Sequence, residues 1–118
     1  MISFFKNIFK KSDPIDKFYV DINSTTVTIT HPERDTEKVE WKDIQSIKII
    51  TTDEGPFLPD FWLALIGTNE GCLIPLGCQG YDKVYNIVSK YDNFDFKKVI
   101  EASTSTDNNE FFIYKKNT

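Results

Sequence analysis

Hydrophobic and polar residues alternate through much of the first two thirds of the chain, which is the pattern of half-buried β-strands. Residues 18–22 and 26–31 carry this alternation on either side of a polar turn at Asn23-Ser24. β-Branched and aromatic residues dominate the alternating positions, as is typical of strands. The two segments therefore predict a β-hairpin.

Four more strands are expected before the periodicity becomes helical. A helical turn or bulge is expected at Lys42-Asp43, and a hairpin loop at 67–71. Residues 61–66 are apolar without alternation, which predicts a central strand covered on both faces. The four strands are expected at 38–41, 44–52, 61–66 and 72–76.

The last third of the chain has helical rather than strand periodicity. Apolar residues at helical spacing predict a helix over 81–91, with Gly80 as a candidate N-cap. Asp95 has the position of an N-cap for a second helix, which ends near Ser103. A final strand is expected at 110–114.

The order of these elements predicts an α+β fold. We expect an antiparallel β-meander, forming a half-barrel or curved sheet of the pleckstrin-homology-like kind, with two C-terminal helices and a final strand. The final strand departs from the pleckstrin-homology pattern. Residues 1–12 predict a short amphipathic helix that packs on the core or touches a membrane interface, and 13–118 a single domain.

Composition and charge narrow the choice of partner. The chain has 118 residues, 40% of them hydrophobic, and a net charge of −4. Without Lys6, Lys10 and Lys11, the remaining 11 basic residues face 18 acidic ones, a net charge of −7. This balance argues against nucleic acid and favours a basic partner. No apolar run approaches the ~20 residues of a membrane span, and no signal peptide is evident, so we expect a cytoplasmic protein.

Candidate catalytic chemistry is sparse. His31 is the one histidine, and neither Cys72 nor Cys78 has an activating histidine near it in sequence. Phosphate-binding and dinucleotide-binding glycine motifs do not occur. We therefore expect no enzyme, no cofactor and no metal site, and a structural role for these three residues.

The segment 51–62 combines carboxylates, aromatic rings and a Gly55-Pro56 kink. Three interpretations stay open: a structural loop with capping carboxylates, a protein-binding surface, or a metal or paired-carboxylate site. Trp62 either lies under covering helices or marks an exposed interface. The protein-binding interpretation has five candidate partner-contacting residues, which are Asp53, Glu54, Phe57, Asp60 and Trp62.

Several short motifs carry a resemblance. Trp41-x-x-Ile44, the run from Thr51 to Pro56, Asp60-x-Trp62 and the Gly-Cys-x-Ile-Pro run from Gly71 together resemble a family of small, uncharacterised bacterial proteins. The resemblance implies no activity. In size and charge, such proteins are similar to the immunity proteins of bacterial toxin systems.

The leading hypothesis is therefore a non-catalytic protein-binding domain, most specifically an immunity protein that neutralises a basic toxin domain. One alternative is a pleckstrin-homology-like interaction module with a housekeeping role, adjacent to a membrane through residues 1–11. Another is a small metal-dependent enzyme that uses the acidic loop. Unpaired sheet edges leave homodimerisation open.

Overall fold

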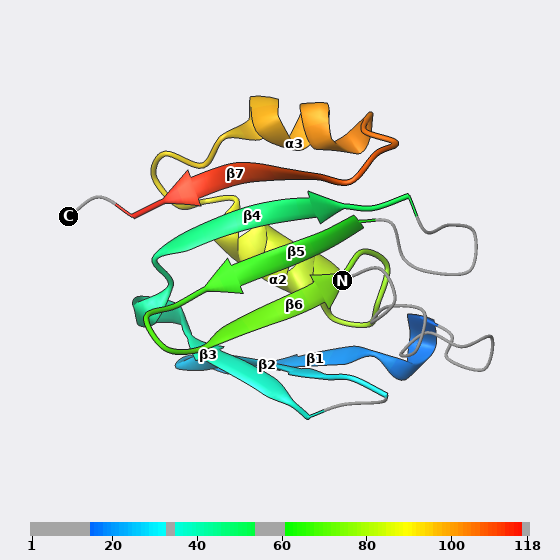
Figure 1. Ribbon diagram of the computed structural model, residues 1–118. Helices are drawn as coiled ribbons and strands as arrows, with labels where there is room; N and C mark the ends of the chain where they lie inside the picture. The colour runs from blue at the N-terminus through cyan, green and yellow to red at the C-terminus, as the bar shows by residue number, and fades with distance from the viewer. Residues whose placement is uncertain (1–14, 33–34, 54–60, 117–118) are drawn as a thin grey trace.

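The structure is a computed structural model that describes residues 15–32, 35–53 and 61–116. The expected helix at 1–12 lies outside these ranges. The described residues form an α+β fold, which confirms the expected class (Figure 1). Two short 3-10 segments accompany the strands and helices, η1 at Ile15–Lys17 and η2 at Trp41–Asp43. The helical turn expected at Lys42-Asp43 is therefore present as η2.

The smaller sheet has the order β1-β2-β3 and is antiparallel throughout. The predicted hairpin is confirmed, because Val20 pairs with Ile29 and the turn side chain Asn23 accepts backbone hydrogen bonds from Thr25 and Thr26, both at 2.8 Å. An Asn at this turn position satisfies backbone donors that the strands leave open. The strands of this sheet are β1 (Tyr19–Ile22), β2 (Thr26–Thr30) and β3 (Glu37–Glu40).

The larger sheet has the order β6-β5-β4-β7, also antiparallel. β5 is central and its residues 62–65 are buried, which confirms the strand covered on both faces. β7 returns after both helices to pair with β4, with a register shift between Ile47 and Lys48. The strands of this sheet are β4 (Ser46–Thr51), β5 (Phe61–Ile66), β6 (Gly71–Pro75) and β7 (Asn109–Lys115).

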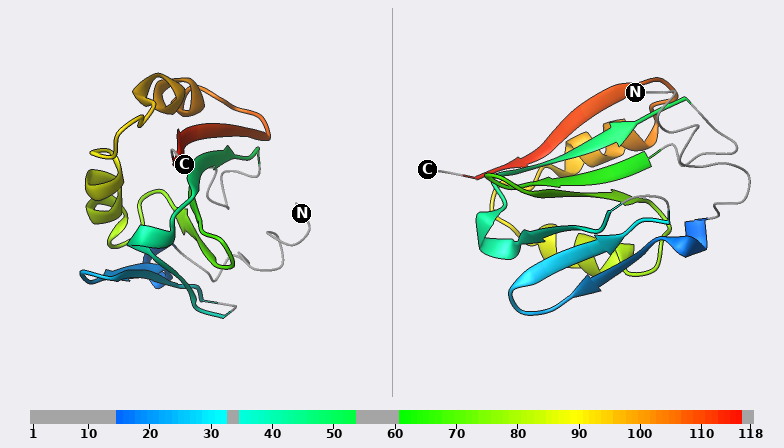
Figure 2. Two further views of the ribbon diagram at one scale, coloured as in Figure 1. Left: turned by 90° about the vertical axis from the view of Figure 1, so that its left-hand side faces the viewer. Right: turned by 60° about the horizontal axis from the view of Figure 1, so that its bottom comes forward.

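The helices α2 (Tyr81–Val88) and α3 (Phe96–Ser103) lie on the same side of the larger sheet (Figure 2). The predicted cap of α3 is confirmed, because the Asp95 carboxylate accepts the backbone N–H of Lys98 at 3.0 Å. Gly80 is the N-cap of α2, with φ of +93°. α2 ends at Val88, three residues before the predicted end, so Tyr91 lies beyond the helix.

The meander divides into two sheets and does not close into a barrel. β2 and β3 pack beside β6, and one backbone donor of β6, the Leu73 N–H, bonds to the side chain of Glu37 at 2.9 Å. Side chains from both sheets and both helices share one core. No helix in the described ranges is long and apolar enough to cross a bilayer.

Candidate partner-binding site

The predicted acidic segment is only partly described. Asp53 is exposed, and its backbone N–H donates to Asn108 Oδ1 at 3.3 Å. Glu54, Phe57 and Asp60 lie outside the described residues, so their predicted roles stay predictions.

Of the two alternatives left open for Trp62, the structure shows burial and not an exposed interface. Trp62 is 1% exposed, and its ring meets that of Phe18 edge-to-face at 6.0 Å between centroids. β5 is one of the two inner strands of the larger sheet, and its residues 62–65 are buried. Trp62 therefore stabilises the core and cannot contact a partner in this arrangement.

His31 directly follows β2 and is buried. Its Nε2 lies 3.1 Å from Glu37 Oε1, and its ring packs against Phe18 at 5.4 Å. A general base needs access to a reacting group. His31 is buried, and its ring contacts Glu37 and Phe18.

The two cysteines are free thiols in the core. Burial raises the pKa of the Cys72 thiol to about 12 and that of Cys78 to about 11. The thiolate is the nucleophilic form, and the raised pKa values favour the protonated thiols near neutral pH. In the parts of the chain that the structure covers, no group of three or more His, Cys, Asp or Glu side chains could hold a metal ion.

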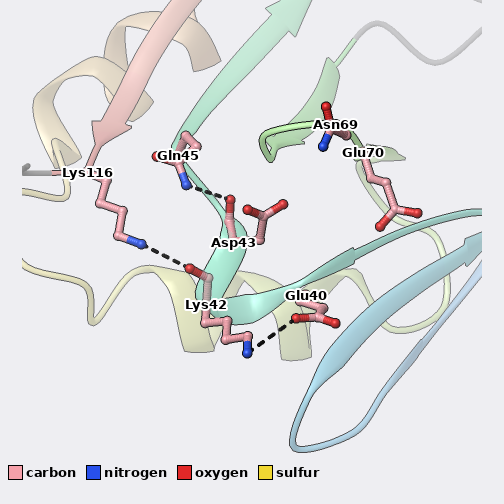
Figure 3. Close-up of a pocket in the computed structure, with 7 residues that line it drawn as sticks. All are labelled: Glu40, Lys42, Asp43, Gln45, Asn69, Glu70 and Lys116. Atoms are coloured by element: carbon pink, nitrogen blue, oxygen red, sulfur yellow. Dashed lines mark hydrogen bonds and ion pairs between the residues drawn. The ribbon is translucent and has the colours of Figure 1, made fainter.

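Two adjoining pockets open at the end of the larger sheet where η2, the β5–β6 turn and the end of β7 meet. The first, which we call the charged pocket, has a volume of about 580 Å³. Lys116 and Glu70 lie on opposite sides of it (Figure 3). Its lining residues are Glu40, Lys42, Asp43, Gln45, Asn69, Glu70 and Lys116.

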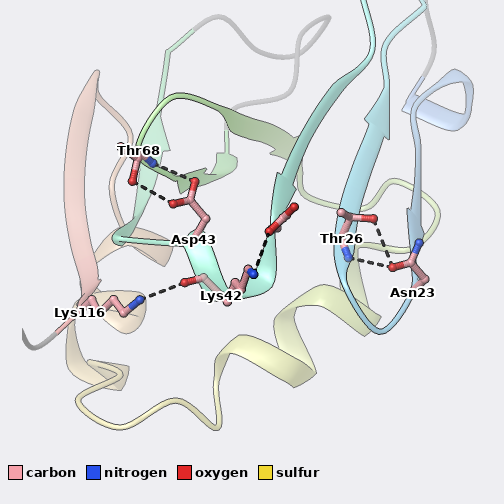
Figure 4. Close-up of polar contacts among 7 residues, drawn as sticks. Asn23, Thr26, Lys42, Asp43, Thr68 and Lys116 are labelled. Carbon is pink, nitrogen blue, oxygen red and sulfur yellow. Dashed lines mark hydrogen bonds and ion pairs between the residues drawn. The ribbon is translucent and has the colours of Figure 1, made fainter.

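Asp43 holds the β5–β6 turn against η2. Its two carboxylate oxygens accept hydrogen bonds from the Thr68 backbone N–H at 3.1 Å and the Thr68 hydroxyl at 2.9 Å (Figure 4). The approach is close, because a Cβ on Gly67 would lie 2.7 Å from Asp43 Oδ2 and 2.9 Å from Glu70 O. Asp43 is thus committed to structure, whereas the Glu70 carboxylate makes no hydrogen bond or ion pair with any described residue.

Lys116 connects the end of β7 to η2. Its Nζ donates to the Lys42 carbonyl oxygen at 3.0 Å, and its backbone N–H donates to Gln45 O at 2.8 Å (Figure 4). The Lys42 side chain, in contrast, is 85% exposed, and its Nζ lies 3.9 Å from Glu40 Oε1. Both lysines border both pockets.

The second pocket, which we call the tyrosine pocket, has a volume of about 480 Å³. The rings of Tyr91 and Tyr114 meet at 5.1 Å and 61° within it. Trp41 forms another wall and is fixed by a hydrogen bond from its Nε1 to Asn23 O at 2.8 Å. The full lining is Trp41, Lys42, Ile44, Tyr91, Asp92, Tyr114 and Lys116.

The hydroxyl groups of this pocket are available as donors. Burial, and secondarily the neighbouring Tyr114, raises the pKa of Tyr91 above its usual value, so its hydroxyl keeps its proton near neutral pH. Neither Tyr91 nor Tyr114 makes a hydroxyl hydrogen bond within the described ranges. Tyr91 and Tyr114 line this pocket together with Lys42 and Lys116.

Sequence reasoning missed this surface. Trp41 stood out only as part of a motif, Tyr91 only as a helix position, and Tyr114 only as a strand position. Their joint placement depends on where β7 pairs and where α2 ends. No local pattern signals either event.

No protein-family model, curated protein or solved structure matches this chain. Its functional assignment therefore depends on the chemistry of the surface just described.

Proposed function

We propose that this chain is a non-catalytic protein-binding domain and, most specifically, an immunity protein that neutralises a bacterial toxin domain in the cytoplasm. The observation that carries the proposal is the η2 end of the larger sheet. Three half-buried aromatic side chains, Trp41, Tyr91 and Tyr114, meet there beside a rim of both charges. Trp and Tyr surrounded by polar groups are the composition of protein-binding hot spots.

The charge of the chain favours a basic partner. Its net charge is −4, and Glu70 and Asp53 present exposed carboxylates at opposite ends of the larger sheet. An acidic protein attracts a basic one over a Debye length and accelerates their encounter. Toxin domains that act on nucleic acid carry such basic surfaces, because their substrate is polyanionic.

The first test is capture of the partner by the tagged full chain from a lysate of its own source, with identification by mass spectrometry. The captured protein is then expressed alone and together with this chain. The proposal expects one stoichiometric partner that stops growth when expressed alone and is harmless in the presence of this chain. A captured protein that is harmless by itself, or no specific capture, would exclude the immunity role.

A second measurement separates binding from neutralisation. Isothermal titration of the purified partner with this chain should give a stoichiometric complex. Its affinity should fall when Tyr91 or Tyr114 is replaced by Ala and should not fall for Leu76→Ala, an exposed apolar residue outside both pockets. If Leu76→Ala weakens binding and the tyrosine variants do not, the interface lies elsewhere.

A further inference from the structure

Helix α3 exposes apolar residues of the kind that a helix in a globular protein normally turns toward the core. Phe96 and Ile100 are 54% and 65% exposed, and their spacing of four residues places them on one face of the helix. We call these two residues the α3 stripe. α3 contacts β7 and β4, yet its buried residue is Ala102, with Val99 half-buried. In Figure 1, α3 lies above β7 at the outside of the molecule.

The α3 stripe has the form of a docking feature. The ring of Phe96 meets that of Phe94 at 4.8 Å, and this contact still leaves more than half of Phe96 exposed. Two large apolar side chains four residues apart on an exposed helix are the anchors by which a helix binds a complementary surface. Their contact with such a surface removes apolar area from water.

The charges beside the stripe indicate what covers it. Lys97 and Glu101 each follow a stripe residue by one position, so they form a second row along one flank of the stripe. Both are exposed. Lys97 makes no ion pair with any described residue, and Glu101 Oε1 lies 3.5 Å from Lys98 Nζ in an exposed pair, which is a weak interaction. One flank of the stripe therefore carries a positive charge followed, one turn later, by a negative charge.

This order of charges is complementary to the same helix running in the opposite direction. A two-fold axis that places Phe96 against Ile100 of a second copy places Ile100 against Phe96 of that copy. The same axis brings Lys97 opposite Glu101 of the second copy, and Glu101 opposite its Lys97. An anionic lipid surface is a poorer match, because the chain has a net charge of −4. A basic protein is also a poorer match, because Lys97 and Lys98 are exposed on α3.

We propose that α3 is a self-association surface, on which two copies of this chain pack antiparallel through Phe96 and Ile100 with Lys97–Glu101 ion pairs at the rim. The inference does not rest on the proposed function, and neither pocket at the η2 end contains a residue of α3. Two side chains from each copy bury less than the roughly 1,000 Å² of a stable interface, so the dimer is weak, with a Kd of about 100 µM.

The first experiment is sedimentation velocity of the full chain at concentrations from about 10 µM to about 1 mM, which span that Kd. We expect a reversible monomer–dimer equilibrium. Ile100→Asp should stay monomeric throughout, and because Ile100 is exposed the variant should keep the wild-type melting temperature. Leu76→Asp is the matched control, since Leu76 is 49% exposed and lies between β6 and α2. It should associate as the wild type does.

The second experiment tests the antiparallel arrangement through its charges. Lys97→Glu places two carboxylates at each rim, and Glu101→Lys places two ammonium groups there. Each variant alone should associate about fivefold more weakly than the wild type. In an equimolar mixture opposite charges face each other again at both rims, so a mixed dimer should form with wild-type affinity. A fluorophore on the N-terminus of one variant reports it, and local damage to either helix would not be reversed by mixing.

The proposal is overturned if the wild type is monomeric at the highest concentration, if Ile100→Asp associates as the wild type does, or if mixing the two charge variants restores nothing. A monomeric wild type that binds phosphatidylglycerol vesicles through Ile100 would assign the stripe to a lipid surface and exclude the dimer. The two proposals fail separately. A dimer without a toxin partner would remove the immunity role and keep the α3 interface, and a toxin bound by a strictly monomeric chain would do the reverse.

Discussion

His31 Nε2 lies 3.1 Å from Glu37 Oε1, and both residues belong to the smaller sheet or the loop that leads out of it. The same oxygen of Glu37 accepts the backbone N–H of Leu73 at 2.9 Å from the larger sheet. One carboxylate therefore satisfies a buried imidazole and an edge donor of β6. It is one polar connection between the two sheets, and the Cys72 thiol of β6, which donates to Val27 O of β2 at 3.6 Å, is another.

Glu37→Ala should destabilise the protein by about 1–3 kcal/mol, because a largely buried donor loses its acceptor and His31 loses this contact. Glu37→Gln, which keeps an acceptor oxygen, should cost less. Urea unfolding gives both values. Glu70→Ala is the matched control, since Glu70 is exposed, and should change stability by less than about 0.5 kcal/mol. Equal stability of Glu37→Ala and Glu70→Ala would show that Glu37 does not join the sheets.

Substitutions at Gly77 and Gly80 distinguish the stability cost of a left-handed backbone conformation from the cost of a steric clash. Both glycines have positive φ, +92° and +93°, but a Cβ on Gly80 would lie 2.7 Å from Val20 O, whereas one on Gly77 would meet nothing within 4 Å. Gly77→Ala should therefore cost about 1–2 kcal/mol for its conformation alone. Gly80→Ala should cost about 1–3 kcal/mol more, because the α2 N-terminus must move away from β1. Thermal unfolding of both variants measures the difference, and similar costs would contradict the close approach.

The buried thiols predict a loss of stability at alkaline pH. In the folded protein the pKa of Cys72 is about 12 and that of Cys78 about 11, against an ordinary value of 9.0. Above pH 9.0 the unfolded chain releases these protons first, so the folded state binds more protons and stability falls as pH rises. Each thiol contributes a slope of about 1.4 kcal/mol per pH unit.

Denaturant unfolding between pH 8 and pH 11 checks this slope. Cys72→Ala should be less stable than the wild type at neutral pH but should lose stability less steeply above about pH 9. A wild-type slope that Cys72→Ala leaves unchanged would assign the alkaline transition to other groups.

As the cap of α3, Asp95 should contribute about 1 kcal/mol to the free energy of unfolding, because its carboxylate accepts the Lys98 N–H in the first turn. Asp95→Ala removes the cap, and Asp92→Ala removes an exposed carboxylate three residues earlier that caps no helix. Chemical unfolding should place Asp92→Ala within about 0.5 kcal/mol of the wild type. If the two variants lose equal stability, the cost arises from net charge and not from the cap.

Charge reversal at either end of the larger sheet identifies the end that meets a basic partner. Glu70→Lys lies at the η2 end and Asp53→Lys lies in the predicted acidic segment. The proposed interface predicts that Glu70→Lys slows association about tenfold at low salt and flattens its salt dependence, with a smaller effect of Asp53→Lys. Stopped-flow association with the captured partner measures both. If Asp53→Lys slows association more than Glu70→Lys does, the interface is instead at the predicted segment that includes Glu54, Phe57 and Asp60.

Local sequence patterns were sufficient to predict most of the helices and strands. The alternation on both sides of Asn23 specified the first hairpin, because side chains alternate faces in every strand. The continuous apolar run 61–66 specified a strand covered on both sides, and Asp95 specified the start of α3 through a hydrogen bond three residues away. Each of these signals is contained within a few neighbouring residues, so the sequence alone determined them and the α+β class.

Tertiary structure decided the rest. Aromatic and acidic residues near each other in sequence made 51–62 the predicted site, yet the central position of β5 buries Trp62. The surface proposed instead brings together Trp41, Tyr91 and Lys116, which become neighbours only because β7 pairs with β4 and α2 ends at Val88. Strand order and helix ends depend on the packing of the whole core. A periodicity read along one segment does not contain that information.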